Sequence, residues 1–194
     1  MSNSSATGGY LAPSTPAPLY DDALTDALQA MVVGITGLPG TLVRPRWQAT
    51  PPKMPEINVD WCAIGVTGFT PDAYGAQIHS PSGDGSTTLY RTEVLEVLAS
   101  FYGPSRFGNA TLFSDGLQIP QNWEMVAPIG IVFVEGGAPR GVVDLLNTKW
   151  VQRADISVVF RRQVSRTYPI LNVLSGVGSI QSDRPDDQSF DTEN

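Results

Sequence analysis

The residue types best suited to chemistry are scarce in this chain, which has one cysteine, Cys62, and one histidine, His79. A cysteine nucleophile needs an adjacent base, so a Cys–His pair would have to join these two residues. Cys62 lies between Trp61 and Ala63 in an apolar run, which is typical of an inert buried thiol. A zinc site needs three or four Cys or His ligands, and the chain has two. The sequence therefore favours neither a nucleophilic pair nor a zinc centre.

Carboxylates and glycine-rich loops give no stronger indication of catalysis. The acidic residues are scattered, so nothing favours hydrolysis by paired acids. The stretch SPSGDGST at 80–87 lacks the Gly-Lys-Ser/Thr ending of a phosphate-binding loop, and GGAPRG at 136–141 lacks the spacing of a dinucleotide fingerprint. Both are predicted to be exposed hairpin connections. We expect no enzyme activity and no cofactor.

The stretch 150–162, WVQRADISVVFRR, alternates apolar and polar residues over thirteen positions. This period of two predicts a long strand with one buried face. Its even face is expected to place Ile156, Val158 and Phe160 in the core, whereas its odd face carries Arg153 and Asp155.

Three arginines, Arg161, Arg162 and Arg166, lie at or past the expected end of this strand. Three guanidinium groups in six residues are too many for a dry core. They form either a solvated basic end or a set of partners for carboxylates of a neighbouring subunit, since arginine suits bidentate pairs at interfaces. Together with Arg153 and Asp155 they are the candidate subunit-interface residues.

The composition argues against several classes of protein. Only 16% of residues are charged and the net charge is −7, so the chain lacks the basic footprint of a nucleic-acid binder. No apolar run approaches the roughly 20 residues of a membrane span, and the N-terminus does not resemble a signal peptide. A lone cysteine suits a reducing compartment, so the protein is expected to be cytoplasmic.

In the first half of the chain, residues 1–18 are rich in Ser, Ala, Gly and Pro and are predicted to be a flexible arm. A helix capped by Asp21 or Asp22 is expected to end at Gly37. A short edge strand around Pro45 should follow. The next strand, 57–69, is expected to alternate, with one set of residues on one side: Ile57, Val59, Trp61, Ala63 and Phe69. A returning strand is predicted at 74–79.

The second half begins with a predicted strand at 89–102, whose Leu95, Val97, Ala99 and Phe101 share one face. Arg91 and Glu93 are expected to continue that face outward, away from the core. A helix over this stretch is the alternative, because Leu95, Leu98 and Ala99 also fit a helical stripe.

After it, the pattern predicts a helix at 104–118 interrupted near Gly116, a short helix at 120–127, a strand at 129–135 and one helical turn at 142–146. The order of elements predicts an α+β fold, with helices packed on one face of an antiparallel or mixed sheet. We expect one domain over 19–181, between the arm at 1–18 and an acidic tail at 182–194. The tail carries five acidic residues against Arg184 alone.

Four blocks of the sequence resemble the neck or tail-terminator family of tailed bacteriophages. They are QAMVVGITGLPGTLVRPRWQATPP, WCAIGVT, DGLQIPQNWE and NTKWVQRADISVVFRRQVSRTYPILNVLSG. The resemblance covers roughly residues 20–180 and implies a tail-terminator-like α+β fold and a non-enzymatic virion protein of the head–tail junction.

The same resemblance implies a homo-oligomeric ring, with a hexamer favoured, between connector or adaptor proteins and the tail tube or sheath. It also implies assembly in the host cytoplasm. Double-stranded DNA would pass through its lumen without sequence-specific binding, and no membrane is involved. Two alternatives stay open: another phage tail-completion, tube or baseplate component, and an unrelated soluble binding module or enzyme. An acidic wall is compatible with DNA passage, because it adds no counterion-releasing phosphate contacts.

Overall fold

The computed structural model describes residues 3–146, 149–173, 175–180 and 188–193. The chain divides into two compact units. The first, here called the core unit, comprises Ala17–Gly75 and Arg91–Val164, and the second, the arm unit, comprises Met1–Pro16, Ala76–Tyr90 and Ser165–Asn194. Strands β4 (Ser86–Tyr102) and β7 (Lys149–Tyr168) contribute residues to both units. The expected division into arm, single domain and tail stays a prediction.

A seven-stranded mixed sheet organises the fold. Its main path runs β1 (Val43–Pro45), β2 (Trp61–Pro71), β4, β7 and β5 (Ile131–Gly136), while β3 (Ala76–Ser80) pairs with β4 and β6 (Arg140–Leu146) pairs with β7. Strand β1 lies parallel to β2, whereas the β2–β4, β3–β4, β5–β7 and β6–β7 pairings are antiparallel. The short β1 lies at the sheet edge, as its proline predicts.

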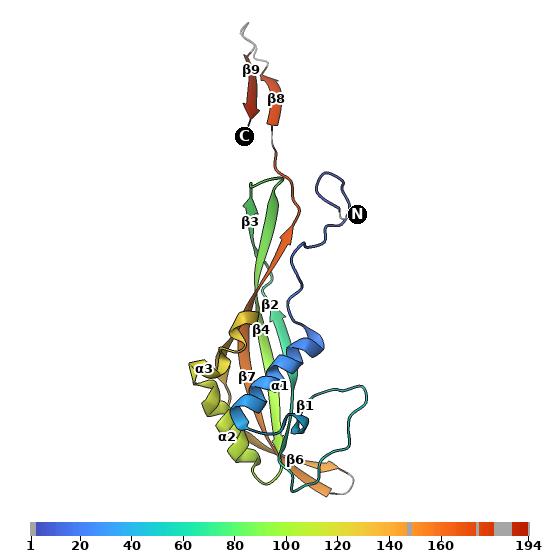
Figure 1. Ribbon diagram of the computed structural model, residues 1–194, viewed down its shortest axis with the longest axis vertical. Coiled ribbons are helices and arrows are strands. Elements are labelled where there is room, and N and C mark those ends of the chain that lie inside the picture. Colours follow the sequence, from blue (N-terminus) through green and yellow to red (C-terminus); the bar gives the residue numbers. More distant parts are fainter. Residues whose placement is uncertain (1–2, 147–148, 174, 181–187, 194) are drawn as a thin grey trace. The chain divides into compact units, whose positions relative to one another are not determined.

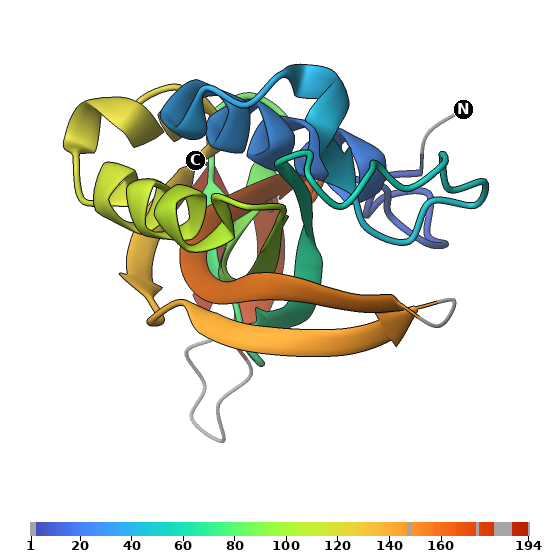
Figure 2. The same ribbon diagram turned by 90° about the horizontal axis from the view of Figure 1, so that it is seen from below.

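The three helices of the core unit gather on one side of the sheet (Figure 1, Figure 2). They are α1 (Asp21–Thr36), α2 (Arg106–Leu117) and α3 (Pro120–Trp123). Short 3₁₀ turns at Gly40–Leu42 and Ala127–Ile129 follow α1 and α3. Apolar residues from both layers form one core, including Leu28 of α1, Phe113 of α2 and Phe160 of β7. This arrangement confirms the α+β prediction.

Helix α1 ends where the sequence predicts, because Gly37 adopts a left-handed conformation at φ 72° and its N–H bonds the carbonyl of Val33. The predicted cap is wrong. Tyr20 occupies the N-cap position without a side-chain cap hydrogen bond, and Asp21 and Asp22 are the first residues of the helix. The two carboxylates in the first turn still complement the helix dipole.

Strand β4 confirms the strand prediction for 89–102 and excludes the helical alternative. Its core-facing side chains are almost completely buried: Leu95, Val97, Ala99 and Phe101. The prediction for the preceding residue of this face is wrong, because Glu93 is also buried, at 0% exposure. The carboxylate is buried there because an arginine of β7 pairs with it, as described below.

The set of residues expected to share one side of the strand at 57–69 is wrong. Strand β2 begins at Trp61, Ile57 is 66% exposed, and the core residues are Cys62 and Ile64. Trp61 is buried for a different reason, since its ring stacks on Tyr102 at 4.0 Å. The apolar Trp61 therefore suggested the wrong core-facing residues, because it is buried by stacking on Tyr102.

Four elements of the second half also differ from expectation. Residues 142–146 form strand β6 and not a helical turn, because β7 offers them a ladder with Val142 opposite Arg153. Helix α2 continues through Gly116 to Leu117, and α3 ends at Trp123 instead of Ala127. Strand β7 extends to Tyr168, beyond the predicted end at Arg162.

In the arm unit, β3 and β4 form the predicted hairpin around the loop 80–87. Asn172 holds this loop, since its side-chain amide donates to the carbonyls of Pro81 at 2.7 Å and Gly83 at 3.2 Å. Strands β8 (Ser175–Ile180) and β9 (Gln188–Glu193) pair in antiparallel fashion, although no strand was expected in the tail. The remaining tail residues, 182–187 and 194, lie outside the described residues.

Candidate interaction surfaces

A buried ion pair joins β4 to β7 on the core side of the sheet. Arg162 Nε donates to Glu93 Oε2 at 2.8 Å, and their side chains are 1% and 0% exposed. Tyr20 donates its hydroxyl to Glu93 Oε1 at 2.8 Å, and the Arg162 guanidinium lies 4.5 Å from the Tyr20 ring centroid. Arg162 Nη1 also donates to the carbonyl of Leu19 at 2.5 Å. This cluster fixes the chain immediately before α1 against two strands.

The cluster corrects the prediction for Arg162. The residue was expected at or beyond the end of the strand, but β7 continues and Arg162 is only 2% exposed. A buried guanidinium is tolerated here because a carboxylate, a carbonyl and an aromatic ring surround it. Its charge has a carboxylate partner inside the subunit, and a role for Arg162 in a subunit interface stays a prediction.

A row of polar side chains lies on strands β4, β6 and β7, on the other face of the sheet. Arg153 Nε donates to both oxygens of Asp155, at 3.0 and 3.1 Å, and Nη1 pairs with Asp144. The Ser100 hydroxyl donates to Asp155 and accepts from Arg46. Arg153 and Asp155 therefore brace strands within one subunit, and an additional contact with a neighbour stays a prediction.

Charge coupling along this row also affects Tyr102. Burial raises the pKa of the Tyr102 phenol, although the adjacent Arg153 and Arg46 act in the opposite direction. For Arg153 itself, burial lowers the pKa of the guanidinium, but Asp155, Tyr102 and Asp144 together outweigh that effect and the net shift is upward. Both groups thus stay protonated at neutral pH.

The two other candidate arginines are more accessible. Arg161 is exposed in the core unit, where it faces Val132 across the β5–β7 register. Arg166 is half-buried in the arm unit. Their role in a subunit interface stays a prediction.

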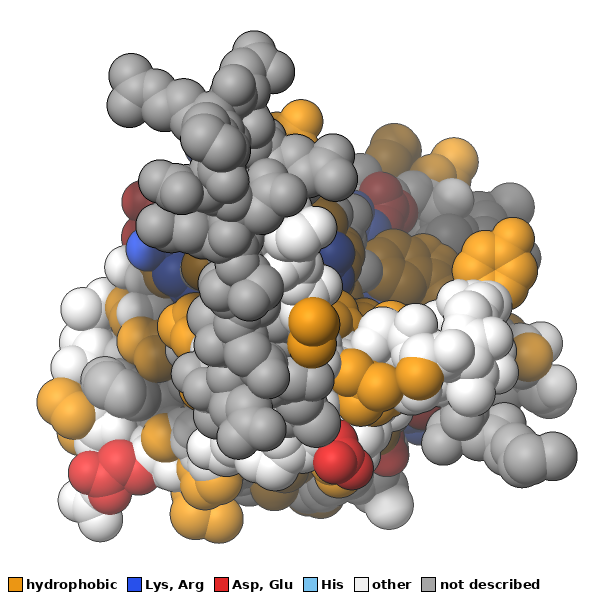
Figure 3. Space-filling view, turned by 90° about the horizontal axis from the view of Figure 1, so that it is seen from above, with side chains coloured by type: hydrophobic (Ala, Val, Ile, Leu, Met, Phe, Trp, Pro, Cys, Tyr) orange, Lys and Arg blue, Asp and Glu red, His pale blue; other side chains and the backbone are white. Residues whose placement is uncertain are grey.

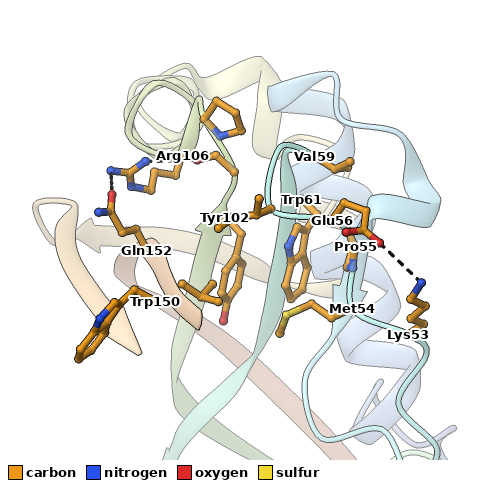
Figure 4. Close-up of a pocket in the computed structure, with 14 residues that line it drawn as sticks. Lys53, Met54, Pro55, Glu56, Val59, Trp61, Tyr102, Arg106, Trp150 and Gln152 are labelled. Carbon is orange, nitrogen blue, oxygen red and sulfur yellow. Dashed lines mark hydrogen bonds and ion pairs between the residues drawn. The ribbon is translucent and has the colours of Figure 1, made fainter. Parts of the chain in front are cut away.

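An open groove with aromatic walls lies at one end of the core unit (Figure 4). Its volume is about 570 Å³, and the stacked rings of Trp61 and Tyr102 line it, with 6° between their planes. Met54 and Ile57 on its rim are 43% and 66% exposed. We call this feature the aromatic groove; no pattern in the sequence indicates it beyond the aromatic residues themselves.

Charged residues on the groove rim are already engaged. Lys53 pairs with Glu56 at 3.6 Å, and Arg106 donates to the side-chain oxygen of Gln152 (Figure 4). The opening of the groove is therefore mainly apolar, and the charged side chains on its rim are paired within the same chain.

A second apolar surface lies on the β6–β7 ribbon. Leu145 faces Trp150 across the register and Val143 faces Gln152, so these four side chains share one face. The three apolar ones are 57%, 64% and 53% exposed for Leu145, Trp150 and Val143 respectively. We call them the apolar ribbon. They continue the face of β7 that is buried farther along the strand at Ala154 and Ile156.

Cys62 and His79 lie in surroundings that suit structural and not catalytic roles. Cys62 is fully buried, and burial raises the pKa of its thiol far above the usual range. His79 lies between Thr87 Oγ1, 3.0 Å from Nδ1, and Asn172 Oδ1, 2.6 Å from Nε2. Within the described ranges, no three His, Cys, Asp or Glu side chains cluster in a way that could hold a metal ion. No helix among those residues has the length and apolarity to cross a membrane.

A family model for phage neck terminator proteins matches residues 22–183. The chain belongs to this family. No match was found among curated proteins. Membership makes the chain a structural, non-enzymatic component of the phage neck, which associates with other virion neck and tail proteins. The matched region excludes residues 1–21 and the end of the acidic tail.

Sequence reasoning missed two features of this neck terminator. Glu93 could have been recognised from parity alone, because it continues the alternation of Leu95, Val97 and Ala99 toward the start of β4. The aromatic groove had no such pattern, since residues from 53–61, 102–106 and 150–152 meet there only after folding.

Proposed function

We propose that this neck terminator assembles into a ring, with a hexamer favoured, at the head-to-tail junction of the virion. The ring joins the connector or adaptor proteins beneath the portal to the tail tube or sheath, and genomic DNA passes through its bore. The family match over 22–183 is the observation that carries this proposal.

The exposed apolar surfaces support an assembled state. Strand β6 pairs with β7 along one edge, and the sheet order among the described strands places no further strand on its other edge. One face of this ribbon is apolar, whereas the opposite face carries the Arg153–Asp144 ion pair. The exposed apolar face of this ribbon is suited to burial against a neighbouring subunit, while the polar face can stay in contact with water.

The distribution of charge supports passage of DNA without capture. Most arginines with described contacts bind carboxylates, carbonyls or aromatic rings of their own chain, as Arg44, Arg153 and Arg162 do. On the described part of the face seen in Figure 3, lysine and arginine side chains form no continuous patch. Few of the described cations are left to neutralise phosphates, and each neutralised phosphate would strengthen binding by releasing counterions.

Two measurements test the ring. Light scattering and negative-stain images of the purified protein should show a closed oligomer, and a virion map should place it between connector and tail. The double variant Leu145→Ser with Trp150→Ser should lose the ring while keeping the unfolding transition of the subunit. Ile78→Ser is the matched control, because Ile78 is 59% exposed in β3, outside the ribbon.

A protein that stays monomeric under all conditions and is absent from the neck in the map would refute the proposed function. A ring that tolerates the ribbon variant would instead show that subunits meet through another surface.

A further inference from the structure

An exposed tyrosine projects from the N-terminal segment of the arm unit. Tyr10 is 98% exposed, although the turn before it is ordered by hydrogen bonds. The amide of Thr7 donates to the carbonyl of Ser4 at 3.1 Å, and Asn3 Nδ2 donates to the carbonyl of Tyr10 at 3.2 Å. Gly8 and Gly9, with φ of 70° and 82°, supply the left-handed conformations that the turn requires.

Backbone contacts hold this segment on both sides of Tyr10. The amide of Ser5 donates to the carbonyl of Pro169 at 3.4 Å, and the amide of Ser14 donates to the carbonyl of Thr167 at 2.8 Å. These bonds leave the Tyr10 side chain unburied in its own subunit. An exposed tyrosine side chain of this area is normally covered in an assembled protein, because aromatic side chains contribute strongly to the binding energy of interfaces.

The aromatic groove has the chemistry to receive such a side chain. Trp61 and Tyr102 provide ring faces, and Met54 is an adaptable apolar contact on the rim. Residues 8–18, GGYLAPSTPAP, contain no charged side chain, so burying them against the groove would leave no unpaired charge. The Lys53–Glu56 ion pair on the rim would likewise stay intact.

The residues after Tyr10 favour an extended peptide. Pro13 and Pro16 restrict the backbone toward the polyproline II conformation, which aromatic grooves commonly bind. Such a segment loses little conformational entropy on docking, because proline has already restricted it.

We propose that Tyr10–Pro13 of one subunit docks in the aromatic groove of the neighbouring copy. The contact joins two different surfaces of the same chain, and contacts of this type build rings when the rotation between neighbouring subunits closes. This inference rests on the proposed ring. It concerns residues before the family match, which begins at residue 22.

Cross-linking between two single-cysteine variants tests the contact in the full-length chain. Ala12→Cys and Met54→Cys are purified separately, mixed, assembled and treated with a short bis-maleimide. Cys62 is a silent background, because its thiol is fully buried. We expect a cross-linked dimer from the mixture only, and none from either variant alone or from Ile78→Cys mixed with Ala12→Cys.

A ring that forms normally without the Ala12–Met54 cross-link would overturn this inference and leave the proposed function standing. A cross-link confined to one chain, seen in a double-cysteine variant but not in the mixture, would also overturn it. If the wild-type protein forms no ring at all, the proposed function fails first.

Tyr10→Ala provides a second readout. We expect the protein concentration needed for half-assembly to rise on the order of tenfold, as for a buried aromatic interface residue. Tyr74→Ala is the matched control, since Tyr74 is 94% exposed and lies outside the arm. Equal assembly of the two variants would contradict the docking of Tyr10.

Discussion

At the scale of single residues, the Glu93–Arg162 pair makes the sharpest prediction about stability. Both side chains are almost completely buried, and Arg91 also pairs with Glu93 at 3.1 Å, so removing the Glu93 charge takes the carboxylate partner from both arginines. Glu93→Gln should lower the free energy of unfolding by about 3–5 kcal/mol. Denaturant unfolding of the variant and the wild type measures this difference.

Two further variants control this measurement. Glu56→Gln breaks the Lys53–Glu56 pair, whose side chains are 90% and 73% exposed, and should have little effect. The double variant Glu93→Leu with Arg162→Met should recover part of the lost stability, because it removes both buried charges. A double variant no more stable than Glu93→Gln would mean that the contacts of Arg162 with Leu19 and Tyr20 matter more than its charge.

Cys62 gives a prediction about reactivity. Burial raises the pKa of its thiol, so the reactive thiolate is negligible in the native protein even at mildly alkaline pH. A thiol-reactive chromogenic reagent should therefore report no accessible thiol in the native protein and one after denaturation. Rapid modification of the folded protein at neutral pH would show that the core around Cys62 opens.

The remaining arginines test the predicted interface. The double variant Arg161→Gln with Arg166→Gln leaves the buried Arg162 unchanged, so the subunit should keep its melting temperature within a few degrees. If the two residues pair with a neighbouring subunit, assembly into rings or onto tails should fail. Normal assembly would show that these arginines are solvated surface residues.

At the scale of elements, β7 joins the helix-covered core to the apolar ribbon through one continuous face. Phe160 is fully buried and lies 6.1 Å from Phe133, measured between ring centroids, whereas Trp150 on the same face is 64% exposed. Phe160→Ala should cost about 3–5 kcal/mol of unfolding free energy. Trp150→Ala should lower the unfolding free energy of the isolated subunit far less. Thermal unfolding of the two variants measures this difference between a core position and a surface position of the same strand.

At the scale of the whole molecule, a net charge of −7 and the engaged arginines predict weak interaction with DNA. We expect no measurable binding of the free protein to duplex DNA at physiological salt in a mobility-shift assay. Binding that weakens steeply with salt would reveal a basic surface that forms on assembly or that the subunit already carries.

Much of the fold followed from local patterns in the sequence. The alternation of Leu95, Val97, Ala99 and Phe101 determined a strand face, and apolar spacing followed by Gly37 determined the length of α1. These patterns are readable because a strand or helix with one apolar side must bury that side whatever lies opposite. The family blocks in the sequence likewise agree with the matched region.

Tertiary structure alone decided the features that depend on distant partners. Glu93 and Arg162 are 69 residues apart; alternation places each on an apolar face, but only strand pairing supplies the opposite charge that allows each to be buried. Residues 142–146 form a strand because β7 continues far enough to pair with them, and Trp61 is buried because Tyr102 stacks on it. Local sequence sets which side of an element is apolar, but the cost of burying a charge or leaving a strand edge open depends on the neighbour that folding supplies.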